Sequence, residues 1–140
     1  MALLTFHHFK DVEKENWPWL NFGPEEMASK DTGALEIETR LLDLLQALRY
    51  QLDRPLVITS GYRTPEYNAR VSGTGRTGPH TKGVAVDIKV SGEDVYPLVK
   101  AGLGLGFTGI GLKQHGAVGS RFVHLDILTG YPRPNIWTYE

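Results

Sequence analysis

Three residues in the second half of the chain, His80, Asp87 and His124, have side chains that bind metal ions in proteins. His80 ends a glycine-rich stretch, whereas Asp87 and His124 each lie within an apolar stretch typical of a strand. A carboxylate in an apolar strand is unfavourable unless a charge or hydrogen bonds compensate it, and a metal ion would do so. Two imidazoles and one carboxylate suit a catalytic zinc ion whose fourth position is open to a water of lowered pKa. Taken singly, each residue also has an ordinary structural interpretation, so the metal-site interpretation depends on their combination.

The alternation of side chains along the two strands makes that combination geometrically possible. Asp87 shares one strand face with Ala85, and His124 shares one with Phe122 and Asp126. The small side chain of Ala85 leaves room beside the acid. If the two strands are neighbours, His80, Asp87 and His124 converge on one face of a sheet.

A fourth candidate follows the short apolar stretch at residues 56–58, where Ser60-Gly61-Tyr62-Arg63 ends a predicted strand in a glycine turn. Arg63 placed there would bind a substrate carboxylate or stabilise the oxyanion of a tetrahedral intermediate. The alternative is a structural ion pair with Glu66 or Asp87, and spacing alone does not decide between the two.

Composition narrows the function classes. A chain of 140 residues that is 41% hydrophobic and 22% charged is the size of one domain, residues 1–140. The formal net charge of -1 argues against a nucleic-acid partner and against stable association with an anionic membrane. The absence of cysteine excludes disulfides and thiolate ligands, so any metal is held by His, Asp or Glu.

Hydrophobic periodicity predicts an α+β fold, with a small, mainly antiparallel sheet and helices on one side. Residues 1–34 are expected to be an irregular segment packed on the body of the domain. The first long helix is predicted over 35–52, a short one after an N-cap at Thr64, and a second long one over 91–102 capped by Ser91. Strands are predicted at 56–58, 84–88, 109–112 and 122–127, the last two forming a hairpin, before an irregular tail at 131–140.

Four sequence pieces occur in an order that resembles a known family. They are Ser60-Gly61-Tyr62-Arg63-Thr64-Pro65-Glu66-Tyr67-Asn68, His80-Thr81-Lys82-Gly83-Val84-Ala85-Val86-Asp87, Gly109-Ile110-Gly111 and Phe122-Val123-His124-Leu125-Asp126. The chain is similar, from about Phe22 to its C-terminus, to the zinc D-alanyl-D-alanine carboxypeptidases of bacteria and phages. That group is related in structure to lysostaphin-type peptidases and to the Hedgehog signalling domain.

The resemblance implies zinc bound by His80, Asp87 and His124, and hydrolysis of peptide bonds that involve D-amino acids in peptidoglycan. It also implies that Arg63 lies at the active site, with Tyr62 and Ser60 beside it as substrate-binding residues. Two departures from the family pattern matter. Gly78 stands where the family usually has a serine, and Arg121 and Phe122 stand where many members have a catalytic acid or histidine. Asp126 is then the candidate that either activates the zinc-bound water or orients a ligand.

Two functions follow as hypotheses. The first is a monomeric zinc peptidase, a carboxypeptidase or endopeptidase acting on peptidoglycan, such as a phage endolysin. The second is a zinc-containing module that binds peptidoglycan without cutting it, as the missing base at Arg121 and Phe122 suggests. The sequence as given has no signal-peptide pattern. We therefore expect cytoplasmic synthesis, and action on the wall after release or as part of a phage particle.

Overall fold

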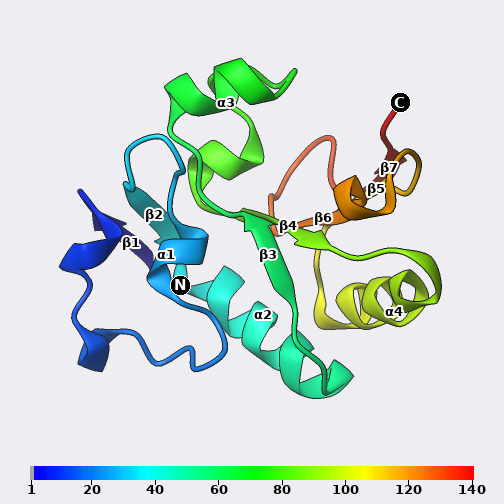
Figure 1. The fold of residues 1–140 in the computed structure, drawn as a ribbon, viewed down its shortest axis with the longest axis horizontal. Coiled ribbons are helices and arrows are strands. Elements are labelled where there is room, and N and C mark those ends of the chain that lie inside the picture. Colours follow the sequence, from blue (N-terminus) through cyan, green and yellow to red (C-terminus); the bar gives the residue numbers. More distant parts are fainter. Residues whose placement is uncertain (1) are drawn as a thin grey trace.

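The structure is a computed structural model and describes residues 2–140 (Figure 1). Its main sheet has the strand order β3-β4-β6-β5-β7. The strands are β3 (Val57–Ser60), β4 (Ala85–Lys89), β5 (Gly109–Lys113), β6 (Phe122–Asp126) and β7 (Asn135–Thr138). Neighbouring strands run antiparallel except β5 and β7, which are parallel. The predicted α+β class with a mainly antiparallel sheet is confirmed.

The hydrophobic core lies between one face of this sheet and two helices, α2 (Thr39–Leu52) and α4 (Val95–Leu105). Both helices lie in the lower part of Figure 1 and α3 (Pro65–Val71) in the upper part, with β4 and β6 between them. Alternate residues of the two central strands are buried in this core: Val86, Ile88, Val123 and Leu125. The intervening residues therefore point to the opposite face, which is left for polar side chains.

The predicted helix over 35–52 is wrong in its first turn. Leu35–Glu38 form strand β2, which pairs antiparallel with β1 (Leu3–Phe6) in a separate two-stranded sheet. Leu35 and Ile37 are completely buried, whereas Glu36 and Glu38, the residue after each of them, are not, a period of two that fits a strand. The apolar run of α2 continues this pattern directly, so periodicity alone merged the two elements.

The N-terminal segment is more regular than predicted. Besides β1 it contains helix α1 (Pro24–Met27) and two short 3-10 turns, Phe9–Asp11 and Lys14–Asn16. Trp19, Phe22 and Met27 are buried in the core cluster. The Trp19 indole also donates a hydrogen bond of 2.8 Å to Asp43 on α2. The buried aromatic residues of this segment thus attach it to the rest of the domain.

The boundaries of the second long helix differ from the predicted ones. Helix α4 begins at Val95 instead of at Ser91, because Gly92–Asp94 form a 3-10 turn and Ser91 makes no capping hydrogen bond. It ends at Leu105 and is capped by Gly106, whose φ of +96° is a conformation that favours glycine. The predicted cap of α3 is confirmed, since the Thr64 hydroxyl accepts a hydrogen bond of 3.1 Å from the Tyr67 amide.

The tail at 131–140 was predicted to be irregular, and this is wrong for residues Asn135–Thr138. They form β7, which adds to the edge of the sheet beside β5. Two nearby prolines, Pro132 and Pro134, masked a strand of four residues in the sequence. Within residues 2–140, the helices lack the combined length and apolarity that a membrane crossing requires.

Candidate metal centre and cleft

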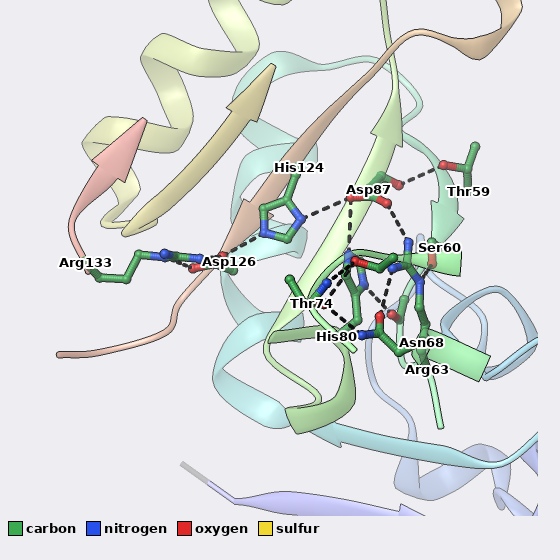
Figure 2. Close-up of polar contacts among 12 residues, drawn as sticks. Thr59, Ser60, Arg63, Asn68, Thr74, His80, Asp87, His124, Asp126 and Arg133 are labelled. Atoms are coloured by element: carbon green, nitrogen blue, oxygen red, sulfur yellow. Dashed lines mark hydrogen bonds and ion pairs between the residues drawn. The ribbon is translucent and has the colours of Figure 1, made fainter. Parts of the chain in front are cut away.

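The strand pairing brings the three predicted metal ligands together. Asp87 on β4 lies directly opposite His124 on β6, and His80 approaches from the 3-10 turn Pro79–Lys82 that precedes β4. All three side chains are buried, and one donor atom from each lies within 4.8 Å of the other two (Figure 2). The polar face of the sheet therefore contains a compact set of two imidazoles and one carboxylate, the donor set of catalytic zinc sites.

The orientation of His80 leaves one ring nitrogen without a partner. Its Nδ1 donates a hydrogen bond of 2.7 Å to the carbonyl oxygen of Gly61. Its Nε2 is buried and has no hydrogen-bond partner in the described part of the chain, although Asp87 Oδ1 is 3.4 Å away. A buried nitrogen in this state is costly unless something binds it. Residue 61 must be small for its carbonyl to be held here, because a Cβ on Gly61 would lie 2.7 Å from the Met27 carbonyl oxygen.

In His124 the two ring nitrogens have the reverse roles to those in His80. Its Nε2 donates to Asp126 Oδ2 at 2.7 Å, and its Nδ1 lies 3.2 Å from Asp87 Oδ1. Each imidazole is therefore fixed by a protein acceptor on one side and presents its other nitrogen to Asp87. Such outer partners set the tautomer and ring orientation of histidine ligands.

The electrostatics of the site keep Asp87 ionised. Burial alone would raise the pKa of its carboxyl, but the hydrogen bond with His124 and the neighbouring His80 ring outweigh burial and hold the pKa well below its usual range. Asp126 behaves alike, because hydrogen bonds with His124 and Arg133 outweigh burial and lower its pKa to about 2. Burial lowers the pKa of His124, but Asp126 and Asp87 raise it overall. Two fixed negative charges thus flank one imidazole.

Asp126, the predicted general base or orienting residue, is completely buried with both oxygens occupied. Its Oδ1 accepts hydrogen bonds from the Leu128 amide at 3.2 Å and from Arg133 Nε at 3.0 Å. Its Oδ2 accepts from His124 and from Arg133 Nη2, each at 2.7 Å. These four contacts hold the Asp126 carboxylate in place, which supports the interpretation that Asp126 orients His124 over the interpretation that it is the general base.

Arg63 lies at the opposite side of Asp87 from His124 (Figure 2). Its Nη2 is 3.1 Å from Asp87 Oδ2, its Nε donates to Ser60 at 2.9 Å, and its Nη1 donates to Asn68 at 3.0 Å. Of the two structural partners considered for it, Asp87 is the one observed. Arg63 also lines the cleft beside the site, which leaves its predicted role toward substrate open.

The other two predicted substrate-binding residues, Tyr62 and Ser60, are set back from the cleft. Tyr62 is buried, and burial together with the nearby Glu36 carboxylate raises its pKa to about 12. Ser60 accepts the hydrogen bond from Arg63 Nε. Neither side chain is among those that line the cleft. Direct substrate contact by either residue stays a prediction.

The departure at Gly78 has a structural counterpart. A Cβ at Gly78 would collide with the hydroxyl of Thr74, which occupies the space that a serine side chain would need. Thr74 lines the cleft, and its Oγ1 accepts a hydrogen bond of 2.8 Å from the Asn68 amide. A hydroxyl is therefore present beside the site, supplied by the loop after α3.

The site opens into a cleft of about 460 Å³. One wall comes from the loop at 72–74, and the other from β7 and the residues just before and after it, with Arg133, Trp137 and Tyr139. None of these three residues was predicted from the sequence. The available signal for Trp137 and Tyr139 was Gly111 in β5, because a Cβ there would lie 2.7 Å from the Trp137 indole nitrogen and 2.9 Å from the Tyr139 ring.

An α+β domain with a buried His-Asp-His donor set at the base of a cleft defines a candidate metallopeptidase. The sequence profile of the peptidase M15 family matches residues 21–126, and the chain belongs to this family. Arg133, Trp137 and Tyr139 lie beyond the matched residues.

Curated relatives agree with this assignment. The chain is 29% identical over 121 residues to the peptidoglycan L,D-endopeptidase MepK of Escherichia coli strain K12. The MepK proteins of Escherichia coli O157:H7 and Shigella flexneri match to the same extent. The aligned region covers 84% of this chain but 62% of the relative, so the chain corresponds to less than two thirds of MepK.

Proposed function

We propose that the chain is a zinc-dependent peptidase that hydrolyses peptide bonds of bacterial peptidoglycan. The observation that carries the proposal is the buried Nε2 of His80, which has no hydrogen-bond partner among residues 2–140 and faces the same Asp87 oxygen as Nδ1 of His124. Without an ion, this arrangement leaves one buried nitrogen unsatisfied at the base of an open cleft. A donor set of two nitrogens and one oxygen fits zinc, and family membership supports a metal-dependent peptidase.

Each residue of the site would have a distinct role, which its position determines. A zinc ion held by His80, Asp87 and His124 would supply a water activated near neutral pH and a Lewis acid for the scissile carbonyl. Gly61 and Asp126 fix the two imidazoles, and Arg63 fixes Asp87. The walls of the cleft then hold the peptide beside these groups.

We favour an endopeptidase over a carboxypeptidase. A carboxypeptidase needs a cation for the terminal carboxylate of its substrate. Arg63, the predicted cation, already contacts Ser60, Asn68 and Asp87. The relatives named as L,D-endopeptidases support the same choice.

The test is digestion of purified, cross-linked peptidoglycan by the zinc-loaded protein, with the products identified by mass spectrometry. His124→Ala removes one proposed ligand, and His115→Ala is the matched control, because His115 is an exposed histidine of the β5–β6 loop. We expect new soluble peptides from the wild type and from H115A, and none from H124A. Release of free D-alanine in place of cross-bridge fragments would favour the carboxypeptidase.

A zinc-containing binding module is the second candidate. The observation in its favour is the full occupation of Asp126, which leaves the predicted base engaged elsewhere. Equimolar zinc in the wild type, retention on peptidoglycan and no soluble product would establish this module and overturn the peptidase. Absence of zinc from the folded wild type at saturating metal would overturn both.

A further inference from the structure

Arg133 forms the outer end of a continuous chain of polar contacts that leads to the candidate metal centre. Its Nε and Nη2 contact both oxygens of Asp126, at 3.0 and 2.7 Å, and Asp126 in turn contacts Nε2 of His124 at 2.7 Å. Figure 2 shows Arg133 and Asp126 on one side of the His124 ring and Asp87 on the other. Arg133 comes from the segment between β6 and β7, outside the match to the family profile.

The two-point contact controls how the carboxylate is rotated. Oδ2 must point at His124 for the imidazole to keep its orientation, while Oδ1 accepts the Leu128 amide. A planar guanidinium that contacts both oxygens fixes this rotation, which a single-point cation such as lysine does not. It also compensates a carboxylate that is completely buried.

Arg133 is itself held in place from the other side. Its guanidinium carbon lies 4.7 Å from the centre of the Trp137 ring, a cation–π contact, and Trp137 belongs to β7. The same indole lies 5.2 Å from the His124 ring, centre to centre. The last strand of the sheet thus supports both ends of the contact chain.

We infer that Arg133 is a positioning residue of the metal centre, which acts through Asp126 to hold the His124 ring with Nδ1 toward the metal. The inference rests on the proposed zinc site. It assigns a function to the C-terminal segment, which completes the orientation of a ligand that β6 supplies.

The experiment compares Arg133→Met and Arg133→Lys with Arg54→Met in the full-length chain. Arg54 is the matched control because it also forms an ion pair, with Asp94, at a partly exposed site outside the cleft. Zinc affinity is measured by competition with a chelator. Solvent exchange of the His124 Nε2 proton is measured by NMR of the zinc-loaded, ¹⁵N-labelled protein.

We expect R133M to weaken zinc binding by roughly tenfold, the low end of the loss for a direct partner of a ligand, because Arg133 acts one residue further out. The His124 Nε2 proton should exchange faster in R133M, because Asp126 is no longer held against it. R133K should fall between R133M and the wild type in both measurements, and R54M should match the wild type. Unchanged zinc affinity and unchanged proton exchange in folded R133M would overturn the inference.

Two further measurements keep the outcome decisive. If R133M fails to fold, R133K with wild-type zinc affinity and wild-type proton exchange would overturn the inference in its place. Combining the arginine change with Asp126→Asn should weaken zinc binding no further than D126N alone, since Arg133 acts through Asp126. Additive losses would contradict this route. Zinc binding and peptide cleavage by the wild type test the proposed function separately, so failure of one leaves the other readable.

Discussion

The carboxylate of Asp126 occupies the space that a side chain at Gly109 would fill. Gly109 on β5 lies directly opposite Asp126 on β6, and a Cβ built on it collides with the carboxylate. Asp126 has little freedom to move aside, because the Leu128 amide, His124 and Arg133 hold it. The glycine is therefore needed for space, since its backbone is not in the left-handed region.

Gly109→Ala should destabilise the protein and weaken its metal site together. Forcing a methyl group into a packed, polar position typically costs about 1–3 kcal/mol. Displacement of Asp126 should also release the His124 ring and lower zinc affinity. Denaturant unfolding of the chelator-treated protein and zinc competition measure the two effects.

Gly104→Ala is the control for this change. Gly104 lies within α4, and a Cβ on it would meet no atom of the rest of the protein within 4 Å apart from its own helix backbone, so alanine there should stabilise the helix by about 0.5–1 kcal/mol. Zinc affinity should stay at the wild-type value. If G109A is as stable as the wild type and binds zinc as tightly, the spatial role assigned to Gly109 is wrong.

Gly111→Ala should act on the cleft wall more than on the metal. Its Cβ would lie 2.7 Å from the Trp137 indole nitrogen; Trp137 belongs to the edge strand β7, and Tyr139 follows the end of that strand. These rings can shift outward at lower cost than Asp126 can. We expect a higher KM for peptidoglycan fragments and a smaller loss of zinc affinity than in G109A. Steady-state kinetics and zinc competition on both variants make the comparison, and an unchanged KM with strongly reduced zinc affinity would contradict it.

Arg63→Met tests whether Arg63 serves the metal site or the substrate. The arginine contacts Asp87 at 3.1 Å and is held by Ser60 and Asn68, so its loss should leave Asp87 less fixed. We expect zinc affinity to fall by roughly tenfold, the low end for a partner of a ligand. Arg76→Met, which removes an exposed ion pair with Glu66, should leave zinc affinity unchanged. An increase in KM at unchanged zinc affinity would instead assign Arg63 to substrate binding.

The ligand set was accessible from sequence because it depends on short-range rules. Alternation placed Asp87 and His124 on the polar faces of two strands, and the assumption that these strands are neighbours is confirmed by their direct pairing. The α+β class followed from the same periodicities. The N-cap at Thr64 was also visible, since hydroxyl capping depends on adjacent residues.

Features that depend on distant pairing were not accessible. Residues 35–38 pair with the strand at residues 3–6, about thirty positions earlier in the chain, and no local signal separates them from α2. β7 forms because an edge of β5 is available and because Gly111 leaves room for the Trp137 and Tyr139 rings. Arg133 was missed for the same reason, since its partner is defined only once the segment after β6 folds back.

Asp31 gives the protein a specific loss of stability in acid. Its Oδ1 accepts hydrogen bonds from Ser29 at 2.6 Å and from the Thr32 amide at 2.8 Å, and its Oδ2 accepts from Thr64 at 2.7 Å. Burial would raise the pKa of the carboxyl, but these hydrogen bonds outweigh it and lower the pKa below its ordinary value of 3.8. Asp31 thereby joins the N-terminal loop to the residue that caps α3.

The lowered pKa of Asp31 determines how the stability of the fold changes with pH. A carboxyl with a lower pKa in the folded state than in the unfolded state stabilises the fold above its unfolded pKa. That stability is lost as the pH falls from about 3.8 through the lower, folded value. Asp31→Asn should therefore cost about 1 kcal/mol near neutral pH, a modest value because the site is exposed. The difference between wild type and D31N should shrink in acid below that window.

Urea unfolding of wild type and D31N across this pH range measures the difference directly. Other carboxylates with lowered pKa, including Asp87 and Asp126, also destabilise the fold in acid, but they are common to both proteins and cancel. Asp11→Asn is the control, because Asp11 is an exposed carboxylate that makes none of the Asp31 contacts. A stability difference that stays constant with pH would show that the Asp31 contacts do not depend on its charge.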